Sequence, residues 1–325
     1  MSDDGATVGR VRKILAGPAG AGQRLDNFLL RELKGVPRSR VYRLLRRGEV
    51  RVNGGRAKPE YRLAADDLVR LPPVRDAVDT VGGPARVPDS LQATVRDALI
   101  HEDERILVFH KPAGLAVHGG SGLSFGLIEA LRALRPDEPL ELAHRLDRDT
   151  SGCLVVARTR AALRELHALL REGQVEKHYT ALVAGRWQLG RKKIDAPVLT
   201  NLRQGGKRMV RVHSEGKTAV SIFAPRVHYR ELATLMDVEI HTGRTHQIRV
   251  HADFAGHPIA GDEKYGQREF NARMREFGLR RMFLHSSAIA FKWPGAISPV
   301  SISVGLPADL EQVLSAMPRK AGAQS

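Results

Sequence analysis

The stretch His144-Arg-Leu-Asp-Arg-Asp-Thr-Ser-Gly152 leads directly into the apolar run Leu154-Val-Val-Ala157. The apolar run predicts a buried strand, and the dense Asp, Thr, Ser and Gly residues before it predict a turn with local hydrogen bonds. A turn at the start of a strand can hold one carboxylate exposed at a cleft. Asp147 is therefore the first candidate functional residue, with an ordinary Asx turn as the alternative interpretation.

Short apolar runs and one helical pattern surround this stretch. Runs of strand length occur at 106–109, 179–183, 220–223 and 235–240, whereas 161–172 carries leucines at helical spacing. The mixture predicts an α+β domain in which helices flank a mixed, mainly antiparallel sheet.

The N-terminal part of the chain has a different character. Leu25, Phe28, Leu29 and Leu33 recur at helical spacing and predict one short helix. A second helix is expected just after Pro37, with Val41, Leu44 and Leu45 inward and arginines outward. Two short strands are expected at 50–52 and 68–71, the first followed by the turn signal Asn53-Gly54.

The charge balance favours a polyanionic partner. The 325 residues include 52 Lys and Arg against 36 Asp and Glu, a net charge of +16. Half of this excess lies in residues 24–62, where twelve basic residues stand against four acidic ones. The alternative interpretation of this cluster is an ordinary solvated surface.

Other features of the composition exclude several protein classes. No apolar run approaches the ~18 residues of a membrane-spanning helix, and Met1-Ser-Asp-Asp-Gly-Ala6 does not resemble a secretory signal. The single cysteine, Cys153, cannot form an internal disulfide or a thiolate zinc site. We expect a cytoplasmic protein that binds no membrane.

These patterns divide the chain into five parts. Residues 1–22 are expected to be a flexible leader, 23–73 a small basic α+β module, 74–96 a linker, 97–316 the larger α+β domain and 317–325 a flexible tail.

The small module resembles the S4 RNA-binding domain. The resemblance is carried by Arg24-Leu-Asp26, Ser39-Arg-Val41 and Gly48-Glu-Val-Arg-Val-Asn-Gly54. Arginines on a rigid helix can pair with phosphates and position a folded RNA without reading its bases. The resemblance implies RNA contacts by Arg24, Arg38, Arg40, Arg43, Arg46, Arg47 and Arg51.

The larger part resembles the RluA family of pseudouridine synthases, within it the branch that modifies large-subunit ribosomal RNA. The nine residues 144–152 match the family signature around its catalytic aspartate. Four further segments agree in order: Lys111-Pro-Ala-Gly-Leu115, Lys177-His-Tyr179, His241-Thr-Gly-Arg-Thr-His-Gln-Ile-Arg-Val-His251 and Leu284-His285. The resemblance spans roughly residues 98–305.

This resemblance implies roles for individual residues. Asp147 would be the nucleophile, Arg249 the arginine that pairs with it, and Tyr179 a residue that stacks on uracil or assists proton removal from C5. Arg145 and His144 would contact RNA, Arg145 by filling the space of the extruded nucleotide. The remaining pocket residues would be Lys111, Thr150, Arg244, His246 and Leu284. Tyr179 as an ordinary core residue and Arg145 as an ordinary surface arginine are the alternatives.

Two competing chemistries fit the sequence poorly. If residues 241–251 form a strand, the five-residue spacing places neighbouring histidines on opposite faces, which argues against a metal site at His241, His246 and His251. Asp147 and Asp149 are too close in one turn to act as a glycosidase pair. Isomerisation adds and removes no atoms, so no cofactor is expected.

The resemblance implies a monomer that isomerises uridines in large-subunit ribosomal RNA or in the assembling subunit. A synthase for transfer RNA or another ribosomal site, and a non-catalytic ribosome-assembly factor, remain the alternatives. Extrusion of a base is easiest from single-stranded or distorted RNA, and the sequence does not choose the uridines.

Overall fold

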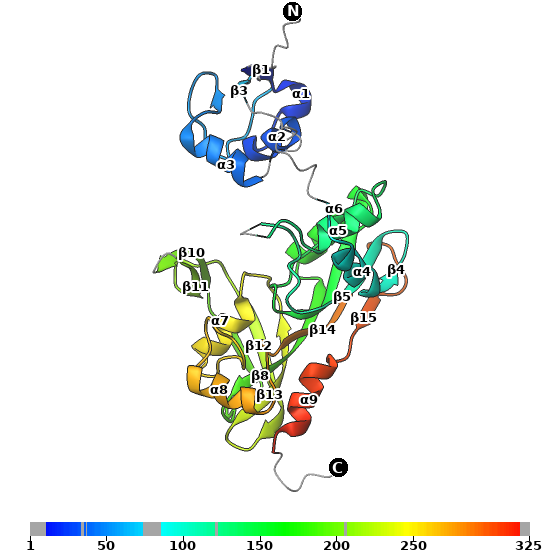
Figure 1. Ribbon diagram of the computed structural model, residues 1–325, viewed down its shortest axis with the longest axis vertical. Coiled ribbons are helices and arrows are strands. Elements are labelled where there is room, and N and C mark those ends of the chain that lie inside the picture. The colour runs from blue at the N-terminus through cyan, green and yellow to red at the C-terminus, as the bar shows by residue number, and fades with distance from the viewer. Residues whose placement is uncertain are drawn as a thin grey trace, which may run out of the picture. The chain divides into compact units, whose positions relative to one another are not determined.

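The computed structural model describes residues 11–33, 36, 38–73, 86–120, 123–204 and 207–318. The chain divides into two compact units, Met1–Arg86 and Val87–Ser325. Each unit has its own hydrophobic core. Figure 1 shows the elements of both units.

The first unit combines three helices with a small antiparallel sheet. The helices are α1 (Gly17–Gly20), α2 (Leu25–Glu32) and α3 (Arg38–Arg47), and the sheet has the order β1 (Arg12–Leu15), β3 (Leu68–Leu71), β2 (Arg51–Val52). Leucines and valines of α2, α3 and the strands fill the core between them, as their spacing predicts. The expected inward residues of α3, Val41, Leu44 and Leu45, are all buried.

The expectation of a flexible leader over 1–22 is wrong for the part that the structure describes. Strand β1 pairs with β3 from Arg12 opposite Leu71 to Leu15 opposite Leu68. The strand is short and mostly exposed, so it lacks the sustained apolar period that sequence patterns require. Its stability comes from the backbone pairing with β3. Residues 1–10 lie outside the described part of the chain.

The turn signal Asn53-Gly54 is confirmed. Both residues have positive φ, 49° and 80°, and the N–H groups of Val52 and Gly55 each donate to the other's carbonyl oxygen. This is the geometry of a two-residue turn that asparagine and glycine favour.

The second unit is built around a large sheet. Ten strands follow the order β4 (Leu99–Glu102), β5 (Ile106–Lys111), β7 (Ser151–Ala157), β14 (Leu284–Phe291), β8 (Val175–Ala184), β13 (Ala233–Ile240), β12 (Val220–Tyr229) and β9 (Lys192–Asp195), with β6 (Glu141–Leu142) beside β7 and β15 (Val300–Ser303) beside β14. In the described residues β7 and β14 are parallel, and the other pairs are antiparallel. The expected α+β class with a mainly antiparallel sheet is confirmed.

Helices cover both faces of this sheet. Apolar side chains of α4 (Asp89–Asp97), α5 (Leu127–Leu134) and α7 (Gln247–Phe254) pack on one face. Those of α6 (Arg160–Arg171) form a second cluster, and those of α8 (Arg268–Glu276) and α9 (Ala308–Ala316) form a third. A separate hairpin, β10 (Val198–Gln204) and β11 (Lys207–Val212), lies near α7 in Figure 1. None of the helices in the described residues is long and apolar enough to cross a bilayer.

Three boundaries differ from the expectation. The predicted linker 74–96 contains the start of α4 at Asp89, and Val95 of this helix is fully buried; residues 74–85 lie outside the described part. The predicted tail begins with Met317, which is buried in the core beside α9; residues 319–325 are also outside. Residues 247–254 form the helix α7, not a strand. A single short helix gives only a weak periodic pattern in the sequence, and its limits depend on how it packs in the folded protein.

Candidate active site

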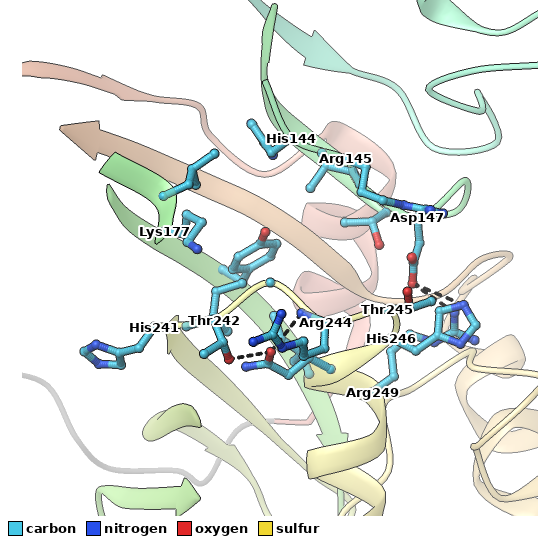
Figure 2. Close-up of a pocket in the computed structure, with 18 of the residues that line it drawn as sticks. His144, Arg145, Asp147, Lys177, His241, Thr242, Arg244, Thr245, His246 and Arg249 are labelled. Carbon is cyan, nitrogen blue, oxygen red and sulfur yellow. Dashed lines mark hydrogen bonds and ion pairs between the residues drawn. The ribbon is translucent and has the colours of Figure 1, made fainter. Parts of the chain in front are cut away.

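A cavity of about 510 Å³ opens in the second unit. Its lining comes from the turn at 143–150, the end of α6, the start of β8, the segment 240–249 and Leu284 of β14. Figure 2 shows these side chains converging from elements that are far apart in the sequence. The signature stretch and the histidine-rich segment therefore form one site.

The turn that carries Asp147 is fixed by the strand that follows it. Gly152 has a φ of 114°, and a Cβ at this position would lie 2.1 Å from the carbonyl oxygen of Ser286 on the parallel strand β14. Only glycine permits this approach. The Thr150 N–H also donates to the Asp147 carbonyl oxygen at 3.2 Å, which closes the turn. The Asp147 side chain is left 18% exposed.

Lys111 stabilises the same turn from inside the protein. It is not among the residues that line the cavity, in contrast to its expected place in the pocket. It is completely buried. Its Nζ donates to the carbonyl oxygens of Pro112, Leu115 and Arg148, at 2.8, 2.8 and 3.0 Å. Burial lowers the pKa of Lys111 to about 7. With three acceptors around its amine, Lys111 stabilises the loop and has no donor left for a substrate.

Arg249 links two carboxylates, as its proposed pairing with Asp147 requires. Its Nη1 donates to Asp147 Oδ2 at 3.1 Å, while Nε and Nη2 donate to the two oxygens of Asp262 at 2.7 and 2.9 Å. Asp262 also accepts the backbone N–H groups of Lys264 and Tyr265. Burial acts to lower the pKa of Arg249, but the hydrogen bonds and charges of Asp262 and Asp147 outweigh it and raise the pKa.

The fork of contacts fixes the direction of the Arg249 guanidinium. Burial would raise the pKa of Asp262, but the hydrogen bonds and charge of Arg249 and the two backbone donors keep it below its usual value. Asp262 is therefore ionised at neutral pH, and it holds Arg249 so that Nη1 points at Asp147. Figure 2 shows Arg249 beside Asp147 and His246.

His246 approaches the same oxygen of Asp147 as Arg249 does. It precedes α7 with φ 55° and ψ 21°, a left-handed conformation that is uncommon for a residue other than glycine. Its Nε2 is 3.8 Å from Asp147 Oδ2, and its Nδ1 is 2.8 Å from the Tyr265 hydroxyl oxygen. Burial lowers the pKa of His246 to about 4, although the Asp147 charge acts in the opposite direction. His246 is therefore neutral at pH 7.

The surroundings of Tyr265 determine which nitrogen of His246 carries the proton. Burial raises the pKa of Tyr265 to about 12, whereas Arg249 and a hydrogen bond with the Val210 backbone lower it. A backbone group that favours the ionised phenol is an N–H donor, so the phenol oxygen accepts from Val210. Its own hydrogen is left for His246 Nδ1, which places the imidazole proton on Nε2, the atom nearer Asp147.

Tyr179 and Leu284 form an apolar wall of the cavity. Both are buried, 7% and 3% exposed, and both line the space. Burial, reinforced by the Asp147 charge, raises the pKa of Tyr179 far above its usual value, and a hydrogen bond with Ser286 only partly opposes this. The phenol therefore stays protonated at neutral pH. Thr150, 2% exposed, lines the cavity beside the turn.

The segment before α7 is held by one glutamine. Gln247 Oε1 accepts the Thr242 hydroxyl and the Arg244 N–H at 2.7 and 3.0 Å, and its Nε2 donates to the Val220 carbonyl oxygen. Arg244 is exposed at the cavity, with Nε donating to the Thr218 carbonyl oxygen. Its other guanidinium nitrogens remain available at the opening.

His144 and Arg145 both line the cavity, but only His144 is held by a hydrogen bond to the backbone. His144 Nε2 accepts the Val155 N–H at 3.1 Å, and burial lowers the pKa of His144 to about 4. It is thus committed to holding the turn against β7. Arg145 is exposed, and Figure 2 shows it next to Asp147 at the cavity.

The histidines of residues 241–251 have separate partners. His241 lies 3.1 Å from Glu239, and His246 contacts Tyr265. His251 is buried, with Nδ1 at Ser221 Oγ and Nε2 at the Ala196 carbonyl oxygen. The segment is a helix from Gln247 onward, so the argument from strand faces does not apply. Within the described ranges no three His, Cys, Asp or Glu side chains gather as a metal site.

The arginines of the first unit differ in their exposure to solvent and in whether they pair with a carboxylate. Arg24 is bound to Asp26 by two hydrogen bonds of 3.1 and 2.7 Å, and the Tyr42 hydroxyl donates to the same carboxylate, so Arg24 has a structural role. Arg43, Arg46 and Arg47 are exposed on one helix, while Arg40 and Arg51 are half-buried. The side chain of Arg38 lies outside the described part of the structure.

Sequence reasoning missed Asp262 and Tyr265 as members of this site. They follow α7 in the short segment Gly261-Asp-Glu-Lys-Tyr-Gly266, which carries no helical or strand period. Lys177 and the α6 residues His167, Leu170 and Arg171 also line the cavity. A polar turn between two glycines was the one available signal, and it is common to many surface loops.

Comparisons with known proteins agree with this geometry. The model of the family described as RNA pseudouridylate synthase matches residues 105–253, and the S4 domain model matches residues 23–69. A protein of Pasteurella multocida (strain Pm70) named Ribosomal large subunit pseudouridine synthase C is 52% identical over 298 residues, 91% of each chain. Its namesake in Escherichia coli (strain K12) is 53% identical over 299 residues, 90% of this chain and 92% of that protein.

Solved structures extend the comparison to the fold. Human RNA Pseudouridylate Synthase Domain Containing 4 superposes with a TM-score of 0.58 at 25% identity, covering 71% of this chain and 98% of that one. Human RNA Pseudouridylate Synthase Domain Containing 1 gives a TM-score of 0.56 at 25% identity, covering 70% and 90%.

Proposed function

Because the chain belongs to the pseudouridine synthase family, we propose that it isomerises specific uridines in large-subunit ribosomal RNA. Relatives that are 52–53% identical over about nine tenths of the chain carry the name of that activity. The single observation that carries the proposal is the Asp147 carboxylate at the cavity, with Arg249 and His246 both directed at its Oδ2 oxygen. A protein that only bound RNA would not need this arrangement.

Asp147 is the proposed nucleophile. A carboxylate acts as a nucleophile only when it is ionised and correctly aimed. Arg249 aims it, because the Nη1 of its guanidinium donates to Asp147 Oδ2 at 3.1 Å and fixes the direction of the carboxylate. The carboxylate attacks either ribose C1′ or the uracil ring, and both routes use the same contact.

The reaction breaks the bond from uracil N1 to ribose C1′ and forms one from C5 to C1′. The base must rotate between these events, and the cavity volume of about 510 Å³ gives room for a nucleoside. C5 loses its hydrogen and N1 gains one, so the atoms of uridine and pseudouridine are the same. The reaction needs no oxidant or reductant.

Tyr179 is proposed to stack on the uracil and to close the cavity against water. Its ring lines the cavity from β8, opposite the turn that carries Asp147. Since burial keeps its pKa well above neutral, the phenol acts as a hydrogen-bond donor at neutral pH. It is a poor acceptor for the C5 proton on its own.

Arg145 is proposed to take the place of the extruded nucleotide. A uridine inside a folded RNA is stacked and cannot reach a cavity until it is flipped out. Arg145 is exposed beside Asp147, on the same turn. In this position its guanidinium can fill the gap in the RNA while the uridine occupies the cavity.

The first unit is proposed to dock the RNA. Arg43, Arg46 and Arg47 are exposed on α3 and can pair with phosphates. Because its proposed substrate is ribosomal RNA, we propose that the protein works in the cytoplasm. We also propose that it acts as a monomer.

The decisive experiment maps pseudouridines at nucleotide resolution in large-subunit ribosomal RNA treated with the purified protein. The wild type should produce a small set of sites, and Asp147→Asn should produce none while binding RNA with similar affinity. Asp149→Asn is the matched control, because this carboxylate lies in the same turn but pairs with Arg148 at 3.2 Å and does not line the cavity.

Other outcomes would point to the alternatives. Tight RNA binding without any pseudouridine from the wild type would favour an assembly factor. Sites found only in transfer RNA or small-subunit RNA would keep the reaction and change the substrate. Full activity of Asp147→Asn would contradict the nucleophile.

A further inference from the structure

Lys177 is a buried lysine at the cavity that the proposed reaction does not yet use. It is 6% exposed and lines the cavity from the start of β8. Figure 2 shows its side chain reaching from the strand into the cavity. Among the described residues, none accepts a hydrogen bond from its Nζ or pairs with its charge. A lysine whose stem is buried and whose amine meets only the open cavity is a candidate for a functional group.

Lys111 is the informative contrast within the same unit. It is also buried, but its Nζ donates to three carbonyl oxygens. Lys111 therefore has a structural explanation. Lys177 has none of these contacts, and its amine is open to the space that a nucleotide would occupy.

The position of Lys177 relative to Tyr179 places it near the uracil. Residues two apart on a strand point to the same face, so both side chains leave β8 toward the cavity that they both line. If the uracil stacks on Tyr179, the Lys177 amine lies at the edge of the same ring. A ring edge is where C5 and its hydrogen are found.

We propose that Lys177 is a catalytic residue that accepts the proton from uracil C5. This inference rests on the proposed function and adds to it the group that completes the reaction. When C5 has joined C1′, C5 carries both the sugar and its hydrogen, and N1 is double-bonded to C6. The neutral amine of Lys177 takes the hydrogen as a proton, and the C–H electron pair re-forms the C5=C6 bond. The π pair of C6=N1 moves onto N1, which takes a proton from water, and the Lys177 ammonium returns its proton to water.

The electrostatic surroundings make the neutral amine far more accessible than that of an ordinary lysine. Burial, with a smaller effect of the Arg244 charge, lowers the pKa of Lys177 to about 8. Besides Asp147, the titratable groups that line the same cavity are His144, Arg145, His167, Arg171, Tyr179, His241, Arg244, His246 and Arg249. None of these is an acid that would hold a charged ammonium, and Asp147 is already paired with Arg249. A general base works best when its pKa is close to the working pH.

Two substitutions separate a base from a positive charge. Lys177→Arg keeps the charge and the length but cannot lose its proton at neutral pH. Lys177→Met removes the charge and keeps the apolar stem. A base predicts that both variants lose activity alike, whereas a phosphate contact predicts that Lys177→Arg stays close to wild type.

Single-turnover pseudouridine formation should fall about 100- to 10,000-fold in both variants, with the Kd for ribosomal RNA within about threefold. RNA carrying 5-deuterouridine adds a direct readout. Loss of the base should make removal of the C5 hydrogen rate-limiting, so the variants should show a larger deuterium isotope effect than the wild type. Added primary amines should partly restore Lys177→Met and leave Lys177→Arg unchanged.

The stability of Lys177→Met tests a purely structural role. Because the amine has no partner in the described structure, Met should unfold at the same or a higher urea concentration than wild type. Lower stability together with wild-type rates would overturn the proposal. A Lys177→Arg rate within about threefold of wild type, or unchanged isotope effects in both variants, would also overturn it.

The proposed function can fail separately. If the wild type made no pseudouridine, the reaction itself would be wrong. If the wild type is active and Asp147→Asn is not, but the Lys177 variants keep wild-type rates, only the role of Lys177 is wrong.

Discussion

Two side chains contact the Asp147 carboxylate, the charged Arg249 and the neutral His246. Arg249 is fixed by Asp262 through two hydrogen bonds and offers its remaining Nη1 to Asp147. His246 approaches the same oxygen of Asp147 as a neutral ring with its proton on Nε2, set by Tyr265. Tyr265 also supports Arg249, whose guanidinium carbon lies 5.0 Å from the centre of the phenol ring. One tyrosine thus supports both neighbours of Asp147.

Tyr265→Phe isolates the effect of the hydroxyl, because it keeps the ring beside Arg249. Loss of one hydrogen bond of about 1 kcal/mol should lower kcat by about five- to tenfold and change KM by less than about threefold. Nitrogen NMR of the histidines should show that His246 no longer holds its proton only on Nε2. Tyr229→Phe, at a buried tyrosine of β12 that does not line the cavity, should leave both readouts unchanged. Wild-type kcat in Tyr265→Phe would show that the tautomer has no catalytic effect.

At the scale of elements, the parallel pair β7 and β14 places the catalytic turn. Gly152 lies against Ser286, and Ser151 lies opposite His285. The Ser151 hydroxyl oxygen is 2.9 Å from His285 Nδ1, and His285 Nε2 is 3.3 Å from the Val304 carbonyl oxygen. Since the carbonyl can only accept, Nε2 carries the proton and Nδ1 accepts from Ser151. His285 therefore ties β7, β14 and the end of β15 together in its neutral form.

This arrangement predicts a dependence of stability on pH. Burial lowers the pKa of His285 to about 4, below the ordinary value of 6.5 that applies to the unfolded chain. The unfolded chain therefore binds more protons between these values, and the free energy of unfolding should fall as the pH drops from about 6.5 to 4. The loss should reach on the order of 3 kcal/mol for this residue.

Urea unfolding at a series of pH values would measure this effect. His285→Gln should reduce the slope of stability against pH in this window, and His144 and His246, whose pKa values are also lowered to about 4, account for what remains. His178→Gln, at an exposed position on β8, should keep the wild-type slope. Equal slopes in wild type and His285→Gln would show that His285 is not buried as a neutral ring.

At the scale of the whole molecule, the chain consists of two units with separate cores. The cavity is formed entirely by residues of the second unit, while the exposed arginines of α3 belong to the first. Chemistry and docking are thus assigned to different parts of the chain.

Deletion of residues 1–86 should separate these roles. The remaining unit keeps its complete cavity, so it should convert uridines at saturating RNA but bind ribosomal RNA more weakly. Fewer phosphate contacts release fewer counterions, so the slope of log Kd against log salt should become shallower. The triple variant Arg43→Gln, Arg46→Gln, Arg47→Gln is the milder test, with a slope reduced by about 2 if each arginine pairs with a phosphate. Equal binding at every salt concentration would refute docking by the first unit.

The sequence predicted those features that repeat along the chain or match a family signature. Short apolar runs predicted β5, β7 and β13, and leucines at helical spacing predicted α6. The segment 144–152 and the segment 241–251 identified Asp147 and Arg249 before their contact was seen. The sequence patterns did not predict strand β1 or the start of α4. Each is only a few residues long, too short to show a hydrophobic period, and each depends on contacts with neighbouring elements.

The sequence by itself determined the fold class, the S4-like module and the family, and it singled out the carboxylate proposed as the nucleophile, because local patterns or contiguous motifs encode each of these. Only the tertiary structure decided which side chains surround that carboxylate. Asp262, Tyr265 and Lys177 reach the cavity from separate elements, and Lys111, which belongs to a matching motif, turns away into the loop. Burial and partners are properties of the folded chain, and they set the pKa and the role of each group.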